Sequence, residues 1–246
     1  MRARSPAPAP GTRRADLGRI RLSERDVAGL MLCGEMYGAP YDLLAAALAV
    51  SPDRLRGIVA RWRRAGYADT GRLGPGPAWC WLTRQGMATT GLGYTASRPS
   101  LARLAHIRAV LAIRLTLHDS PAGADGQAWW RSERSIRQAG GFGSPGGHVP
   151  DAEVTWPETG QGAYAGECWA IEAELTPKPL DRTAAIMSRL LTLPGADGPA
   201  GRLRYDRVVY LTSDPARPVV QRAAALTGDR LAARLVIRDL PAGAVV

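Results

Sequence analysis

A helix start signal at residues 51–53 constrains the fold of this chain more than any other local feature. Ser51 can cap a helix, Pro52 fits its first turn, and an acidic residue follows at the positive end of the helix dipole. Apolar residues then recur at i, i+3, i+4 and i+7, at Leu55, Ile58, Val59 and Trp62. The opposite side is basic, with Arg54, Arg56, Arg61, Arg63 and Arg64. The pattern predicts an amphipathic helix with one apolar and one strongly basic face.

Two helices are expected before this one, and a hairpin after it. Ser23 can cap the first helix, and a shorter helix is expected over residues 41–50. A Gly-Pro-Gly-Pro turn separates two extended segments at 68–73 and 78–82. Three helices followed by a hairpin is the order of a winged helix-turn-helix, whose third helix enters the major groove. The sequence therefore predicts a winged helix-turn-helix DNA-binding domain over residues 21–86, with double-stranded DNA as its partner.

Positive charge is concentrated in the first part of the chain. The net formal charge is +10, and residues 1–100 hold 15 arginines against 7 acidic residues. Such a field attracts phosphate backbones. It favours DNA binding by the third helix over a protein-interaction module whose arginines are only a solvated face. Residues 1–20 are rich in Pro, Ala and Arg, which predicts a disordered basic tail.

Composition also bears on the compartment of the protein. No apolar run approaches the roughly 20 residues that span a bilayer, and the first residues lack the apolar core of a signal peptide. Cys33, Cys80 and Cys168 are far apart and fit neither a disulfide framework nor a zinc knuckle. We therefore expect a cytoplasmic protein with no membrane partner.

The second part of the chain has a mixed helix and strand pattern. Residues 87–100 are rich in Gly, Thr, Ser and Pro and predict a linker. Residues 101–117 predict an amphipathic helix with its apolar residues on one side. Further elements are expected as strands near 128–136, 151–156 and 168–175, a helix over 180–193, a strand over 206–211, a helix over 216–226 and a strand over 235–239. This α-β-β-β-α-β order predicts a mixed central sheet flanked by helices, forming an α/β domain over residues 101–246 of an α+β protein.

Two glutamates mark the centre of this second domain. Glu172 and Glu174 alternate along one expected strand and therefore lie on the same face. Two acids on one face are costly to bury without a cation, and Asp151 from the neighbouring strand completes a set of hard oxygen ligands for Mg²⁺ or Mn²⁺. Such a metal ion would lower the pKa of a bound water, and Lys178 would stabilise charge developing on a phosphate. The pattern predicts a catalytic set of Asp151, Glu172, Glu174 and Lys178, with Asp151 and Glu172 as metal ligands.

The residues Pro150-Asp151 and Glu172-x-Glu174, in the α-β-β-β-α-β frame, resemble the motif of the PD-(D/E)XK nuclease superfamily. The resemblance implies that the aspartate and the first glutamate bind the metal ion. The lysine of that motif usually stands where this chain has Glu174, a glutamate that some restriction endonucleases also carry. Lys178, the only lysine of the chain, lies just beyond the strand and is placed to reach back.

The chain as a whole resembles the replication-relaxation family of actinobacterial plasmids and mobile elements. The residues that carry this resemblance are the Arg-rich helix ending at Gly66-Tyr67, the segments 81–86, 148–151 and 171–178, and Arg182. It covers residues from about 20 to 226. The resemblance implies a role in plasmid replication, DNA relaxation or transfer. A relaxase or replication protein, and a second copy of the chain in a homodimer, are the protein partners considered.

Two interpretations of the acidic residues remain at this stage. In the first, the chain is a Mg²⁺-dependent DNA endonuclease, and Glu133 is a candidate further acid. In the second, Glu172 and Glu174 pair with arginines such as Arg182 and Arg189, and the protein is a non-catalytic replication or transfer accessory, or a transcriptional regulator, without a cofactor. Two histidines are interpreted as structural: His106 as a core residue on the inner side of its helix and His148, in preference to a metal ligand, as the end of a loop.

Overall fold

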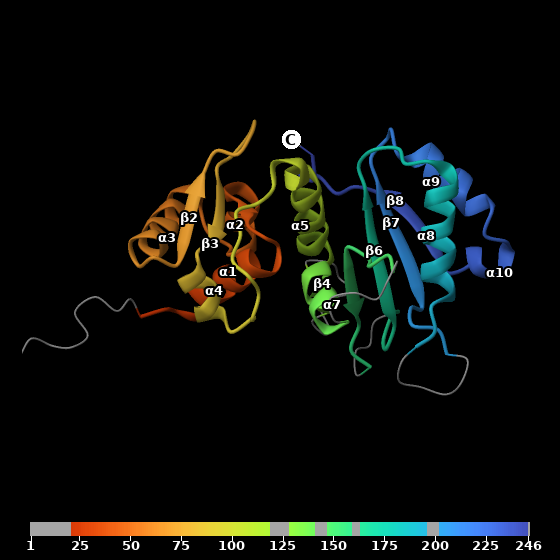
Figure 1. Cartoon of the computed structure of the whole chain (residues 1–246), viewed down its shortest axis with the longest axis horizontal. Coiled ribbons are helices and arrows are strands. Elements are labelled where there is room, and N and C mark those ends of the chain that lie inside the picture. The colour runs from red at the N-terminus through yellow and green to blue at the C-terminus, as the bar shows by residue number, and fades with distance from the viewer. Residues whose placement is uncertain (1–20, 119–127, 141–146, 159–162, 196–201, 246) are drawn as a thin grey trace, which may run out of the picture.

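The computed structural model describes residues 21–118, 128–140, 147–158, 163–195 and 202–245 (Figure 1). Its architecture is α+β, with helices and two separate sheets. The tail expected at residues 1–20 lies outside the described residues. Within the described parts of the chain, no helix has both the length and the apolar character to cross a membrane.

Residues 21–100, here called the N-terminal unit, contain helices and a three-stranded sheet. Its elements in chain order are α1 (Glu24–Glu35), β1 (Ala39–Pro40), α2 (Tyr41–Ala47), α3 (Pro52–Arg64), β2 (Ala68–Gly71), β3 (Trp79–Leu82) and α4 (Arg84–Thr90). The sheet order is β1-β3-β2, and both pairings are antiparallel. The three expected helices and the hairpin are therefore present, and the short strand β1 is an addition that the sequence pattern did not indicate.

The two serine caps form as expected. The Ser23 side chain accepts a hydrogen bond from the Asp26 N–H in a capping box, and Ser51 accepts one from the Arg54 N–H. Helix α3 then buries Leu55, Val59 and Trp62 against the rest of the unit. Local capping and 3.6-residue periodicity thus explain both helices.

The prediction of a linker over residues 87–100 is wrong for its first residues, because helix α4 continues to Thr90. Thr83 caps this helix through the Gly86 N–H. At Gly86 an added Cβ would lie 1.8 Å from the Tyr67 carbonyl oxygen, so the helix packs directly on the backbone after α3. The residues that follow are also packed, with Tyr94 half-buried and Pro99 buried. Glycine at position 86 serves close packing and not flexibility.

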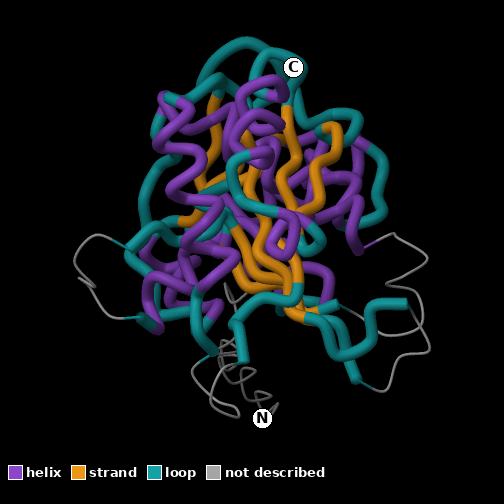
Figure 2. The backbone as a smooth tube through the Cα atoms, turned by 90° about the vertical axis from the view of Figure 1, so that its right-hand side faces the viewer, coloured by secondary structure: helices purple, strands orange, loops and turns teal. Residues whose placement is uncertain are grey.

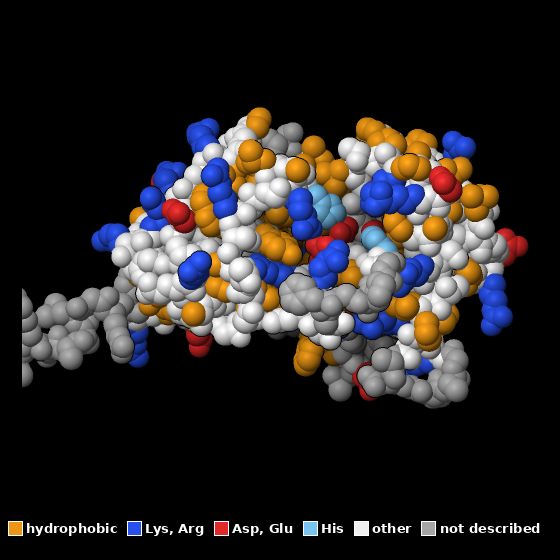
Figure 3. All heavy atoms as spheres, viewed as in Figure 1, with side chains coloured by type: hydrophobic (Ala, Val, Ile, Leu, Met, Phe, Trp, Pro, Cys, Tyr) orange, Lys and Arg blue, Asp and Glu red, His pale blue; other side chains and the backbone are white. Residues whose placement is uncertain are grey.

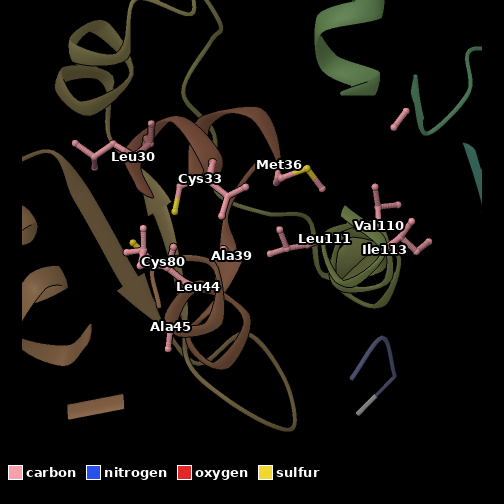
Figure 4. Packing of buried hydrophobic residues seen from close by; sticks show 14 of the residues in the cluster. Leu30, Cys33, Met36, Ala39, Leu44, Ala45, Cys80, Val110, Leu111 and Ile113 are labelled. Carbon is pink, nitrogen blue, oxygen red and sulfur yellow. The ribbon is translucent and has the colours of Figure 1, made fainter. Parts of the chain in front are cut away.

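Helix α5 (Leu104–His118), preceded by the short 3₁₀ turn η1 (Leu101–Arg103), lies between the N-terminal unit and the second sheet (Figure 1). The expectation of one apolar side is wrong, because residues 107–113 are all buried. Figure 4 views α5 end-on: Leu111 points toward the helices of the N-terminal unit, and Ile113 points away from them. A helix buried on all sides belongs to two cores at once, and one apolar cluster runs from α1 through α5 to the second sheet.

Residues 101–245, here called the C-terminal unit, form a five-stranded mixed sheet with helices on both faces (Figures 1 and 2). The strand order is β4-β5-β6-β7-β8; the first two pairings are antiparallel and the last two are parallel. After α5 the elements are β4 (Trp129–Ser132), α7 (Glu133–Ala139), β5 (Ala152–Thr155), β6 (Cys168–Glu174), α8 (Leu180–Thr192), β7 (Arg207–Thr212), α9 (Arg217–Ala225), α10 (Asp229–Ala232) and β8 (Leu235–Asp239).

One expected strand in this unit is too long. Residues 128–136 were expected to be extended, but β4 ends at Ser132 and α7 begins at the next residue. The Ser132 hydroxyl accepts a hydrogen bond from the Ser135 N–H, which is an N-cap that ends the strand and begins the helix. The change matters for the site described below, because the Glu133 N–H donates to the Asp151 carbonyl oxygen at 3.1 Å.

A buried carboxylate, Asp26, joins the first and third helices of the N-terminal unit. The residue is only 1% exposed, and its side chain accepts hydrogen bonds from Ser23, from Arg61 and from the Trp62 indole N–H at 2.8 Å. Burial raises the pKa of Asp26, but these hydrogen bonds outweigh it and hold the pKa below its ordinary value. The ionised form is therefore the native form near neutral pH.

We predict that Asp26→Ala lowers the free energy of unfolding by about 2–3 kcal/mol, because it leaves the Trp62 N–H unpaired in the core. Asp53→Ala, which removes an exposed acid from the first turn of α3, is the control and should cost less than about 1 kcal/mol. Urea unfolding of both variants measures the difference. Equal losses would show that Asp26 is not a structural centre.

Candidate functional site

The three acids singled out by sequence lie together at the junction of β5 and β6. Asp151 immediately precedes β5, and Glu172 and Glu174 alternate near the end of β6. The pairing of Ala152 with Ile171 places Asp151 beside Glu172. Glu172 and Glu174 are 1% and 3% exposed. Neighbouring strands thus bring these carboxylates to one buried place, here called the acidic site.

Asp151 is held by two partners. Its Oδ2 accepts a hydrogen bond from the Ala173 N–H at 2.8 Å, and its Oδ1 lies 2.9 Å from His106 Nε2. His106 comes from α5, so its interpretation as an ordinary core histidine is wrong. Burial lowers the pKa of His106, but the hydrogen bond and charge of Asp151 outweigh this and raise the pKa above its ordinary value. The helix shared by the two units therefore contributes directly to the site.

Glu172 is the most deeply buried acid of the site. Its Oε1 lies 2.6 Å from His148 Nε2, so His148 is a site residue and not only the end of a loop. Burial raises the pKa of Glu172 well above its usual range, and the charges of Asp151 and Glu174 raise it further. Burial also lowers the pKa of His148. Both partners of this hydrogen bond therefore favour their neutral forms.

Glu174 is paired with Lys178, which reaches back from beyond the strand as expected. Burial raises the pKa of Glu174, and the hydrogen bond and charge of Lys178 lower it in part, which leaves it above its ordinary value. The partners that the structure gives the two strand glutamates are thus a histidine and a lysine. The non-catalytic interpretation of these acids had instead predicted arginines of α8 as their partners.

A buried tyrosine hydroxyl faces the same carboxylates. Tyr210 on β7 pairs in register with Glu172 and is fully buried. Its hydroxyl makes no hydrogen bond to a described residue. Burial, followed by the charges of Glu172 and Glu174, raises the pKa of Tyr210. An unsatisfied buried hydroxyl is costly and is typical of positions where a ligand or water is bound.

The site opens at a hollow on one face of the molecule. Figure 3 shows acidic and histidine side chains at the bottom of this hollow, with Lys and Arg side chains around them. Glu133, the candidate further acid, lies near Asp151, but its carboxylate is engaged by two arginines. Its Oε2 accepts from Arg103 at 2.5 Å and its Oε1 from Arg137 at 2.8 Å, because α7 turns its first residue toward these arginines.

The chemistry of the donor set fits a hard divalent cation. Asp151 and Glu172 would hold it, since the charge of Asp151 raises the pKa of the buried Glu172 and a nearby positive ion would stabilise its carboxylate form. When bound, the ion would supply a water of lowered pKa. Among the described residues, no three Asp, Glu, His or Cys side chains are positioned together as a metal-binding group.

The structure also shows what the five arginines of α3 do. Arg54, Arg56, Arg63 and Arg64 are exposed. Arg56 pairs with Asp53 of the preceding turn, and Arg61 is partly exposed and pairs with the buried Asp26. Arg61 therefore stabilises the N-terminal unit through Asp26 while part of its side chain remains exposed to solvent. The other arginines keep the exposed face of the helix basic.

His106 and Tyr210 are the site residues that sequence reasoning missed. Each comes from an element distant in sequence from the carboxylate it faces, so no local pattern indicated it. His148 stands three residues before Asp151, and that proximity was an available signal. No protein-family model, no curated protein and no solved structure matches this chain.

The raised pKa of Glu172 predicts a specific pH dependence of stability. In the unfolded chain a glutamate loses its proton near pH 4.3, whereas the folded protein keeps that proton to higher pH. Stability is therefore lost as pH rises from the unfolded value through the folded one. Glu172→Gln removes this loss and should raise Tm at pH 8 in EDTA, with a smaller gain near pH 5. Each 1 kcal/mol gained in the free energy of unfolding raises Tm by roughly 2–4 °C in a chain of this length.

Thermal unfolding of Glu172→Gln at both pH values checks this, with the exposed Glu158→Gln as the control. A lower Tm for Glu172→Gln at pH 8 would contradict the prediction and indicate an ion pair with His148.

Proposed function

We propose that this chain is a DNA-binding protein that holds duplex DNA through a winged helix-turn-helix in its N-terminal unit. Support comes from the order α1-β1-α2-α3-β2-β3 and the sheet order β1-β3-β2, in which a short strand precedes the second helix and a hairpin follows the third. In a winged helix-turn-helix the third helix enters the major groove, and here that helix is α3.

The exposed face of α3 is the observation that carries this proposal. Arg54, Arg63 and Arg64 are exposed. Small residues stand between them: nothing lies within 4 Å of a Cβ added at Gly57, and Ala60 is exposed. A helix face with small residues near its centre, arginines on either side and Arg64 at its C-terminal end allows the backbone to approach the floor of a groove while the guanidinium groups reach phosphates or guanines.

We predict that Arg63→Ala and Arg64→Ala each weaken duplex binding and each reduce the slope of log Kobs against log salt by about 1. Fluorescence anisotropy with a labelled duplex, at salt concentrations between about 50 and 200 mM, measures both quantities. The control is Arg222→Ala, an exposed arginine on α9. Wild-type affinity and slope in both α3 variants would overturn the assignment of α3.

A second candidate activity is metal-dependent hydrolysis of DNA phosphodiester bonds in the C-terminal unit. The observation that favours it is the convergence of Asp151, Glu172 and Glu174 with the Tyr210 hydroxyl, which has no hydrogen-bond partner among the described residues. The element order α5-β4-β5-β6-α8-β7, with α7 inserted after β4, supports a PD-(D/E)XK nuclease-like fold for this unit. Asp151 and Glu172 would hold Mg²⁺ or Mn²⁺, and Lys178 would face the phosphate as a fixed positive charge.

We predict that wild-type protein nicks supercoiled plasmid DNA in Mg²⁺ or Mn²⁺ and that Asp151→Ala and Glu172→Ala abolish nicking while retaining DNA binding. The matched control is Glu158→Ala, which removes an exposed acid. Cleavage that persists in both site variants would overturn the catalytic assignment. Normal binding without nicking in any metal would leave the non-catalytic accessory or regulator as the function.

The biological setting is part of the same proposal. The resemblance to the replication-relaxation family supports a role in the replication or transfer of a plasmid or mobile element. Site-directed DNA binding is common to both the catalytic and the accessory form of that role. A relaxase or replication protein would then be the partner that the bound complex recruits.

A further inference from the structure

Two arginines at the mouth of the acidic site are organised by one carboxylate. Arg103 Nη2 donates to Glu133 Oε2 at 2.5 Å, while Arg137 donates to Glu133 Oε1 through Nε at 3.0 Å and Nη2 at 2.8 Å. Arg103 belongs to η1 before α5, and Arg137 and Glu133 belong to α7. Elements far apart in sequence therefore bring two guanidinium groups to the same point.

These arginines are open to solvent although the carboxylate between them is not. The Arg103 and Arg137 side chains are 41% and 55% exposed, whereas the Glu133 side chain is 15% exposed. Two guanidinium groups against one carboxylate leave an excess of one positive charge. Each guanidinium has five N–H donors, and Glu133 uses only some of them, so donors remain that face outward.

The pair is restrained and adjoins the candidate site. The Arg103 guanidinium lies 5.2 Å from the centre of the Tyr37 ring, which restrains it from the side of the N-terminal unit. Arg103 and Glu133 line one small cavity together with His106 and Asp151. Arg103 lies within electrostatic range of His106, and Arg137 within range of His148. Arg103 therefore shares a cavity with His106, and the charge of Arg137 reaches His148.

We propose that Arg103, Glu133 and Arg137 form an anion clamp that binds the phosphodiester backbone of the DNA strand lying over the acidic site. The inference rests on the proposed function, because the strand is the same DNA that α3 holds. Planar guanidinium groups bind phosphate oxygens through paired hydrogen bonds. An ionised carboxylate such as Asp151 repels a phosphate backbone, so fixed positive charge at the rim favours a strand placed there. The clamp supplies that charge beside the acids.

The clamp predicts a second contribution to DNA binding that is independent of the arginines on α3. The variant Arg103→Met/Arg137→Met removes both charges and keeps most of the apolar stems. It should bind a labelled duplex of about 30 base pairs more weakly than wild type at every salt concentration. The slope of log Kobs against log salt should fall by about 1–2, since roughly 0.9 is lost for each phosphate contact on duplex DNA.

The matched control is Arg222→Met/Arg230→Met, which removes two exposed charges from α9 and α10, at the far end of the second sheet from the N-terminal unit (Figure 1). Wild-type-like binding in this control and weakened binding in the clamp variant would establish the clamp. Arg137→Met alone changes only an exposed side chain and should retain the wild-type Tm with roughly half the loss of slope. This single variant keeps the test decisive if the double variant is unstable.

Affinity and slope in the clamp variants equal to those of the control pair would overturn the clamp. If Arg63→Ala/Arg64→Ala weakens binding in the same experiment, the proposed function then stands without the clamp. If neither the clamp variants nor the α3 variant change binding, the DNA-binding assignment of both surfaces fails. Weakening by the clamp variants alone would support the clamp and overturn the role of α3.

Discussion

The burial of α5 between two cores is the constraint on which the rest of the structure depends. Its central residues 107–113 are all buried, so the helix requires apolar neighbours from both units. Arg108 pairs with Asp42 of α2, and Arg114 pairs with Glu35 of α1. From α7, the buried Arg134 donates to the Gly34 carbonyl oxygen at 2.7 Å, and its guanidinium lies 4.5 Å from the ring centres of two tyrosines of the N-terminal unit. These contacts hold the basic helix α3 and the acidic site within one packed arrangement.

The three acids of the acidic site have different hydrogen-bond partners from Glu153, a buried acid on the same sheet. Asp151 is held by a backbone N–H and a histidine, Glu172 by a second histidine, and Glu174 by a lysine. Glu153, a buried acid within β5, accepts hydrogen bonds instead from Arg131, Arg204 and the Tyr205 hydroxyl. Two guanidinium groups and a tyrosine hydroxyl satisfy Glu153, which is consistent with a structural role. Two of the three carboxylates of the site are instead held by histidines, the side chains whose ordinary pKa lies closest to neutral pH.

Much of the N-terminal unit could be predicted from the sequence because local chemistry dictates it. The caps at Ser23 and Ser51 and the apolar repeat of α3 act within a few residues, and they determine where helices begin and which face is buried. Strand alternation likewise predicted that Glu172 and Glu174 share a face. The length of β4 could not be predicted in this way, because the cap at Ser132 competes with an extended pattern and contacts to β5 decide where the strand ends.

The sequence by itself determined the helices of the N-terminal unit, the basic face of α3 and the acids of the second sheet, because periodicity, capping and charge are properties of neighbouring residues. Only the tertiary structure decided that α5 is buried on all sides, that β1 exists through its pairing with β3, and that His106 meets Asp151. The physical reason is the same in each case. These features depend on contacts between residues far apart in the chain, and no local pattern records which distant surface will cover a helix, pair with a strand or face a carboxylate.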